Sequence, residues 1–231
     1  MQTEAGRVAL VAGANGMVGL QLLRALVDAG AYRRVIALTR RPLLMEAPRL
    51  VNRIIRFQDL DAELRGVSCD DAFCCLGTTR RAAGSQAAFR AIDHDLVLRF
   101  ATWVQGAGAQ TLVCITSAGA APESRNFYLR VKGETELALE ALRFRSLHLM
   151  RPGLILGERA HWRTTEMIGR VFMPLVNPLL LGQLEQWRAI RATTLAAAMS
   201  AAAQLGLAGV HRHSSRSLRS LASTGRLPPR V

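Results

Sequence analysis

The chain has 231 residues, of which half are hydrophobic and one fifth are charged. This composition excludes a disordered chain, and the length allows a sizeable core. The net charge of +13 comes from 29 arginines and one lysine, which are scattered without interleaved aromatic residues, so we expect no specific nucleic-acid binding.

Strand-type apolar runs alternate along the chain with segments of helical period. The pattern predicts strands at residues 8–12, 35–38, 53–57, 72–76, 111–115 and 146–150, and helices at residues 17–29, 85–105, 126–142 and 193–205. This alternation indicates an α/β fold, a Rossmann-type doubly wound parallel sheet with helices on both faces. We expect a single domain over residues 1–231, because no linker divides the chain.

Two stretches depart from this alternation. Residues 154–190 hold two tryptophans and predict a lid or substrate-side segment. The longest apolar run within them, residues 171–181, is interrupted by prolines and falls short of the roughly 20 residues that span a bilayer, so we expect no membrane span. The basic C-terminal tail, residues 211–231, has five arginines and no acid. It is interpreted as a short strand and helix with arginines facing water, or alternatively as a polyanion-binding arm.

A glycine-rich turn separates the first strand from the first helix. The motif G-A-N-G-M-V-G begins at Gly13 and continues through Asn15, Gly16, Met17 and Val18 to Gly19. The first glycine allows a tight turn, the second admits a pyrophosphate, and the third lets the helix pack closely on the strand. We therefore expect an NAD(P)-binding domain; a tight turn without a ligand is the alternative.

The end of the second strand indicates which dinucleotide binds. An NAD site usually has an acid there, which holds the ribose 2′-hydroxyl, whereas this chain has Arg40 and Arg41. Two guanidiniums suit a 2′-phosphate, so we expect NADP(H) rather than NAD(H). A solvated surface pair is the alternative.

Further candidates follow the third and fourth strands. Asp59 is placed to hydrogen-bond the adenine or, equally, to cap a helix. Gly77 and Thr78 follow the fourth strand at the edge where such sheets hold ligands, although an ordinary turn has the same composition.

Tyr128 and Lys132 are the strongest catalytic candidates. Their spacing of four residues places both side chains on one face of a helix. A nearby ammonium lowers the pKa of a tyrosine and makes it a better proton donor and acceptor near neutral pH. Ser117 ends the fifth strand and is a candidate for holding a substrate carbonyl, or else a turn cap. Ser124 is expected to cap the helix.

These motifs resemble those of the short-chain dehydrogenase/reductases. The resemblance is carried by the glycine motif, Ser117, Tyr128-x-x-x-Lys132 and Arg151-Pro152-Gly153. The segments NFYLRVKGETE and MRPGLILGER are similar to the atypical, epimerase-like branch of HIV-Tat-interacting oxidoreductase-like proteins. The resemblance implies a Rossmann fold, NADPH binding, a Tyr/Lys/Ser site, and Pro152 with Gly153 near the nicotinamide. Where the family often has an asparagine in the helix before the fifth strand, this chain has Asp93-His94-Asp95.

Two functions are consistent with these residues. The first is an NADP(H)-dependent oxidoreductase that acts on a small carbonyl or alcohol. The second is a catalytically silent NADPH-binding regulatory or scaffold protein. We expect a monomer or homodimer.

The cysteines and the N-terminus bear on location. Cys69, Cys74, Cys75 and Cys114 lack zinc-ligand spacing, so we expect no metal. They are interpreted as buried thiols of a reducing compartment. The N-terminal residues predict no signal peptide, so we expect a cytoplasmic protein.

Overall fold

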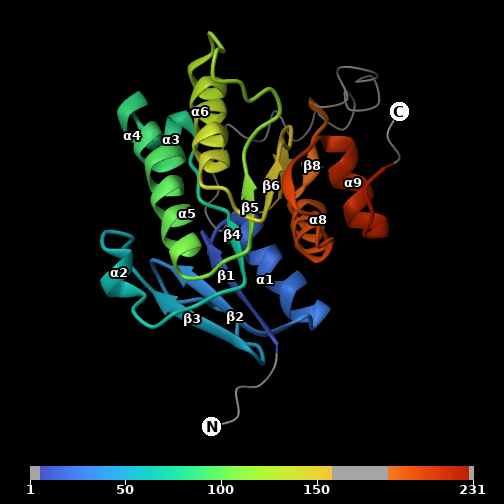
Figure 1. Cartoon of the computed structure of the whole chain (residues 1–231). Coiled ribbons are helices and arrows are strands. Elements are labelled where there is room, and N and C mark those ends of the chain that lie inside the picture. The colour runs from blue at the N-terminus through green and yellow to red at the C-terminus, as the bar shows by residue number, and fades with distance from the viewer. Residues whose placement is uncertain (1–5, 158–186, 229–231) are drawn as a thin grey trace.

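The computed structural model describes residues 6–157 and 187–228. Within these ranges a seven-stranded parallel sheet has the order β3-β2-β1-β4-β5-β6-β9 (Figure 1). Its strands are β1 (Arg7–Ala12), β2 (Tyr32–Thr39), β3 (Leu50–Ile54), β4 (Asp71–Cys74), β5 (Thr111–Ile115), β6 (Ser146–Met150) and β9 (Gly209–His213). A separate parallel ladder joins β7 (Ile155–Leu156) to β8 (Ile190–Arg191). Most of the expected lid segment lies outside the described residues.

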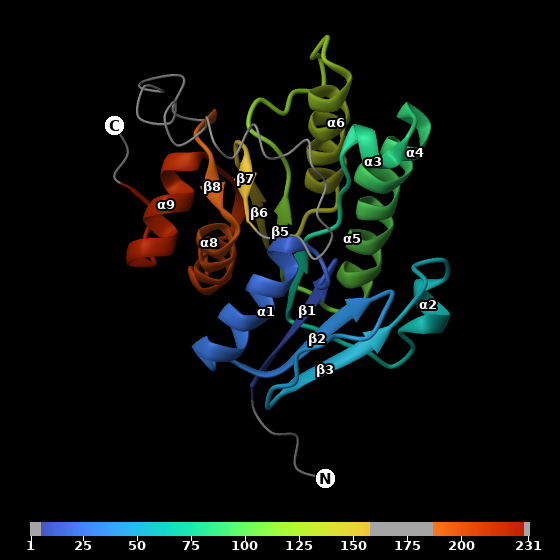
Figure 2. The same cartoon turned by 180° about the vertical axis from the view of Figure 1, so that it is seen from behind.

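Helices cover both faces of the sheet (Figures 1 and 2). They are α1 (Met17–Ala29), α2 (Leu60–Glu63), α3 (Arg80–Ala83), α4 (Gln86–Arg90), the π-helical turn η1 (Ala91–Leu96), α5 (Val97–Gly106), α6 (Phe127–Ala141), α8 (Ala192–Gln204) and α9 (Ser215–Thr224). One hydrophobic cluster includes residues of α1, α8 and α9, and the other includes residues of α5 and α6. Successive residues of β1 alternate between the two clusters, as a strand buried on both faces requires. The Rossmann-type fold predicted from the sequence is confirmed.

The strand order locates the functional edge of the sheet. From β1 the chain first extends the sheet through β2 and β3, and then returns to form β4 on the other side of β1. Ligands of such sheets bind outside the carboxyl ends of the strands at this switch point. The turns after β1 and β4 are therefore where a ligand is expected.

One predicted strand is displaced in the structure, and one predicted helix is divided. The third strand is Leu50–Ile54 rather than residues 53–57. It is the edge strand and largely exposed, whereas the apolar residues that suggested the later position, Ile55 and Phe57, leave the sheet and enter the core. The helix predicted over residues 85–105 is divided into α4, η1 and α5, because a π turn does not change the apolar pattern enough to be visible in the sequence.

The strand and helix predicted in the C-terminal region are present. β9 pairs with β6 in parallel, and α9 buries Leu218 and Leu221 against the core. Arg212 forms ion pairs with Glu140 and Glu136 of α6, so the expectation that the arginines of this region face only water is wrong for this residue. Among the described helices, none has the length and apolar character needed to cross a bilayer.

Candidate active site

The turn after β1 is built on glycines because side chains have no room there. Gly13 has a φ of 76°, and a Cβ on it would lie 2.6 Å from the carbonyl oxygen of Cys75. A Cβ on Gly19 would lie 2.3 Å from the carbonyl oxygen of Gly13, so α1 packs directly on the turn. Gly16 precedes α1 and offers no side-chain cap, which leaves N–H groups of the helix N-terminus available to an anion. A phosphate group fits this cradle.

The other residues of the glycine motif have different environments. The Val18 side chain is buried in the core, so only its backbone can face a ligand. Met17 lies against Gly157, where a Cβ would be 2.7 Å from the Met17 sulfur. The exposed Asn15 donates a hydrogen bond from Nδ2 to the carbonyl oxygen of Arg41 at 2.9 Å. This bond ties the glycine turn to the loop after β2.

Arg40 and Arg41 follow β2 directly, and both are exposed. Their loop is held in place by Asn52 of β3. Its Nδ2 donates to Thr39 Oγ1 at 2.7 Å, and its Oδ1 accepts from the backbone N–H of Leu43 at 3.1 Å. Two guanidinium-bearing residues thus lie at the edge of the sheet on a braced loop that Asn15 connects to the glycine turn.

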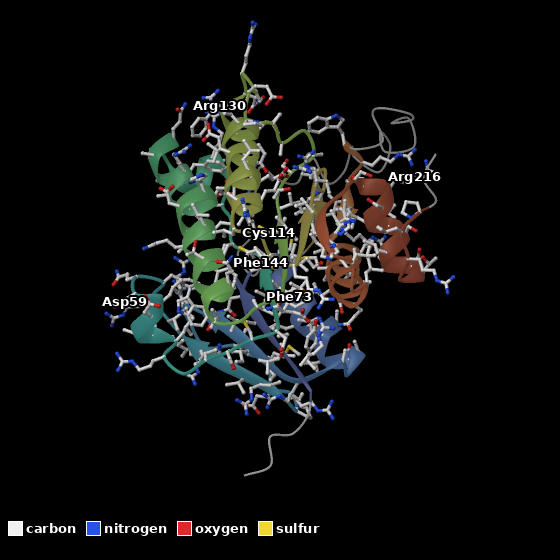
Figure 3. The ribbon with its side chains drawn as sticks, in the orientation of Figure 1. Asp59, Phe73, Cys114, Arg130, Phe144 and Arg216 are labelled. Atoms are coloured by element: carbon white, nitrogen blue, oxygen red, sulfur yellow. The ribbon has the colours of Figure 1, made fainter. Side chains whose placement is uncertain are left out.

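Asp59 has the role of a helix cap. Its Oδ1 accepts a 3.0 Å hydrogen bond from the backbone N–H of Ala62 in the first turn of α2. Figure 3 shows it beside α2, on the side of the molecule away from α9. It also lines a cavity of about 1060 Å³ between α2 and α5, together with Asp95 and Trp103. Contact between Asp59 and an adenine stays a prediction.

Helix α6 carries the Tyr128–Lys132 pair. Asn126 caps the helix by accepting from the backbone N–H groups of Tyr128 and Leu129 at 3.0 and 3.4 Å. The cap is therefore Asn126 rather than the expected Ser124. The Tyr128 ring packs against the buried Phe89 of α4, with ring centroids 5.5 Å apart. These contacts restrict the position of the Tyr128 ring.

Packing against the loop that follows β5 fixes the position of α6. A Cβ on Gly133 would lie 2.2 Å from the backbone carbon of Ala121. The backbone N–H of Ala121 donates to the carbonyl oxygen of Leu129 at 3.2 Å. The loop that begins at Ser117 is thereby held against the helix that carries Tyr128.

Lys132 is buried, with 5% of its surface exposed, and forms an ion pair with the equally buried Asp93 of η1. Its Nζ is 2.7 Å from Asp93 Oδ1. Burial alone would lower the pKa of Lys132, but the negative charge of Asp93 and the proximity of Tyr128 leave that pKa raised above its ordinary value. Asp93 Oδ2 accepts from the backbone N–H of Thr78 at 2.8 Å, and a Cβ on Gly77 would lie 3.8 Å from Nζ. The charged pair is therefore next to the turn after β4.

Ser117 lies on the turn after β5 and is nearly buried. Its hydroxyl donates to the carbonyl oxygen of Ala118 at 3.1 Å, and the Ala118 N–H donates to the carbonyl oxygen of Pro152 at 2.8 Å. The turns after β5 and β6 are thus joined at the ligand-binding edge. Gly153 is confined there, because a Cβ would be 2.6 Å from the carbonyl oxygen of Trp187.

Two neighbours of this site were not assigned a role from the sequence. Asp93 stands where the short-chain dehydrogenase/reductases often have an asparagine, and this difference was the one indication of a role in the sequence. Its pairing with Lys132 depends on the packing of η1 against α6. The Trp187 indole packs on Gly119, where a Cβ would lie 2.6 Å from the ring. Its position in residues 154–190, the expected substrate side, was the only indication.

The fold and this edge define a dinucleotide-binding Rossmann protein of the oxidoreductase superfamily that includes the short-chain dehydrogenase/reductases. The family model "NAD dependent epimerase/dehydratase family" matches residues 9–209, and the chain belongs to that family. It is 35% identical over 166 residues to Protein HTATIP2 of Rattus norvegicus, covering 70% of this chain and 68% of that protein. It is 38% identical over 155 residues to Protein FMP52, mitochondrial, of Saccharomyces cerevisiae, covering 66% and 67%. The resemblance found in the sequence is confirmed.

Solved structures show the same fold. MoeE5 in complex with UDP-glucose and NAD superposes with a TM-score of 0.66 at 18% identity, covering 90% of this chain and 76% of that chain. UDP-glucose 4-epimerase from Thermotoga maritima with UDP-glucose gives a TM-score of 0.68 at 13% identity, covering 96% and 84%.

The expected cytoplasmic location is contradicted by these relatives. The FMP52 proteins of several fungi, including Scheffersomyces stipitis and Emericella nidulans, are named mitochondrial. The cysteines suggested a reducing environment, but buried thiols carry no information about the compartment.

Proposed function

We propose that the protein is an NADP(H)-dependent oxidoreductase that acts on a small carbonyl or alcohol with Ser117, Tyr128 and Lys132. The observation that carries this proposal is the buried, ion-paired Lys132, which lies one helical turn from Tyr128 and beside the turn after β4. A protein that only binds a dinucleotide has no need for a tyrosine next to a charged, buried lysine.

Each residue has a distinct task in this proposal. When bound, the nicotinamide supplies or accepts a hydride. Tyr128 donates the proton to the developing alkoxide or takes it from the alcohol, because its phenol hydroxyl is positioned by Phe89 and the helix cap. Lys132 supplies a positive charge one helical turn from Tyr128 and donates hydrogen bonds to ribose hydroxyls. Ser117 holds the substrate oxygen for this proton transfer.

Pro152 and Gly153 complete the cofactor site in this proposal. They lie on the turn after β6, which is joined to the Ser117 turn by the Ala118 hydrogen bond. Gly77 and Thr78 line the opposite side, next to the charged pair. The nicotinamide would thus lie between the turns after β4 and β6, close to Tyr128.

The preference for NADP(H) is assigned to Arg40 and Arg41. A charge-assisted hydrogen bond to a 2′-phosphate contributes about 1.5–3 kcal/mol, which corresponds to roughly ten- to a hundred-fold in affinity. The hydrogen bonds that hold this loop support the proposal, because less backbone order has to be gained when the phosphate binds.

Titrating NADPH and NADH into the wild type and Arg40→Ala tests this assignment. NADPH is expected to bind the wild type at least about tenfold more tightly than NADH, with most of the difference lost in the variant. Arg24→Ala, which removes the same charge from the exposed face of α1, is the matched control and should keep the preference. Equal affinities of the wild type for both cofactors would refute the proposal of NADP(H) specificity.

A further inference from the structure

A carboxylate and an ammonium are buried together behind the candidate active site. Asp93 is 1% and Lys132 5% exposed, and their charged atoms are 2.7 Å apart. Lys132 Nζ and Asp93 Oδ1 thus form a close, charge-assisted contact within the protein interior. An ammonium has three hydrogens, so the contact with one carboxylate oxygen leaves others for further acceptors.

Asp93 is fixed on both its side chain and its backbone. Oδ2 accepts from the backbone N–H of Thr78 at 2.8 Å. The carbonyl oxygen of Asp93 accepts from Thr135 Oγ1 of α6 at 3.0 Å. Asp93 lies within the π turn η1, and such turns occur often at functional sites because they shift a side chain out of the regular helical register. The carboxylate is thus held at one place next to α6.

Burial makes the charge of Lys132 costly unless a countercharge compensates it. The titratable groups that interact with Lys132 are Asp93 from η1, Tyr128 from α6 itself, Cys74 from β4 and Cys114 from β5. Cys114 lies centrally in the sheet (Figure 3), and its hydrogen bond to Cys74, with burial, raises the pKa of its thiol. The same hydrogen bond lowers the pKa of the Cys74 thiol. Asp93 is the one carboxylate of this set, and it is the group in direct contact with Nζ.

We propose that Asp93 is a positioning residue whose carboxylate keeps the buried Lys132 protonated and holds its ammonium beside the turn after β4. An asparagine at this position would preserve the shape and the Thr78 hydrogen bond but supply no charge. The catalytic consequence rests on the proposed function, because it requires Lys132 to act on Tyr128 and the cofactor. The protonation of Lys132 itself can be measured without cofactor or substrate.

The sequence provides a direct probe, because Lys132 is the single lysine of the chain. Incorporation of ¹³Cε-labelled lysine gives one side-chain NMR signal, and its chemical shift reports protonation of Nζ. In the wild type we expect the signal to stay at the ammonium position up to pH 10. In Asp93→Asn the titration midpoint should fall by about two pH units or more, because desolvation is no longer compensated.

Asp95→Asn is the matched control. Asp95 lies on the same π turn, is 55% exposed and pairs with His94, so its variant should titrate as the wild type does. A midpoint in Asp93→Asn equal to that of the wild type would overturn the proposal. Should Asp93→Asn not fold, the wild-type titration decides: a lysine that loses its proton below pH 10 refutes the proposed pairing.

The two proposals fail separately. NADPH affinity and carbonyl turnover test the proposed function, whereas the lysine titration is done on the free protein. A lysine that stays charged in a protein that turns over no carbonyl supports the role of Asp93 and refutes only the proposed catalysis.

Discussion

Acidification from pH 7.5 to pH 5 is expected to destabilise the fold through two buried histidines, His148 of β6 and His213 of β9. His148 Nδ1 and His213 Nε2 are 2.9 Å apart, and the Ser146 hydroxyl is 2.9 Å from His148 Nε2. Burial and the nearby His213 and His211 lower the pKa of His148 to about 3, and burial and His211 lower that of His213 to about 4. Both rings are therefore neutral in the folded protein throughout this pH range.

The size of the effect follows from proton linkage. An unfolded histidine has a pKa of about 6.5, so below that pH the unfolded state binds more protons than the folded state and stability falls as pH falls. For each such group the free energy of unfolding changes by about 1.4 kcal/mol per pH unit. Between pH 6.5 and pH 5 each histidine therefore lowers the free energy of unfolding by about 2 kcal/mol, and the pair lowers it by about 4 kcal/mol.

Urea unfolding at pH 7.5 and pH 5 measures this loss. His148→Gln should lose about 2 kcal/mol less than the wild type between the two pH values, because one titrating group is gone. His94→Gln, whose histidine lies away from the sheet on η1, should keep the wild-type difference. If the free energy of unfolding of His148→Gln falls between the two pH values by as much as that of the wild type, the two histidines do not cause the acid destabilisation.

Two further outcomes are expected. Gly19→Ala places a Cβ 2.3 Å from the carbonyl oxygen of Gly13, so calorimetric titration should show NADPH binding weakened by more than about tenfold. Gly106→Ala, where a Cβ would meet no atom within 4 Å, is the control and should bind NADPH as the wild type does. Equal NADPH binding by both variants would contradict the close packing of α1 on the glycine turn. Deleting residues 209–231 removes β9 and α9 with the buried Leu218 and Leu221, so the melting temperature should fall while DNA retention at moderate salt stays unchanged. Lost retention at an unchanged melting temperature would favour a polyanion-binding arm.

The sequence predicted the buried part of the fold well. The bounds of α1, β5 and β6 match the predicted ranges residue for residue. A strand covered on both faces is a continuous apolar run, and a helix packed on one face of the sheet has a 3.6-residue apolar period. It failed at β3, where an exposed edge strand has little apolar signal, and at η1, whose π turn leaves the pattern nearly unchanged.

The sequence was less informative about contacts between distant segments. The four-residue spacing of Tyr128 and Lys132 was readable because both lie on one helix. The ion pair of Lys132 with Asp93 joins residues of different elements, and the Asn15 bond to Arg41 joins two loops. Such contacts depend on how α6 packs on η1 and how β1 pairs with β2, which local patterns do not encode.

Comparing the wild type with Tyr128→Phe in NADPH oxidation at 340 nm, over a panel of small carbonyl compounds, tests the central claim most directly. The substitution removes only the phenol hydroxyl, so NADPH affinity should be retained while turnover falls by about 10²–10⁴. A carbonyl that Tyr128→Phe reduces at the wild-type rate would contradict the assigned mechanism. Tight NADPH binding by the wild type with no carbonyl reduced would contradict the oxidoreductase itself and favour a catalytically silent NADPH-binding protein.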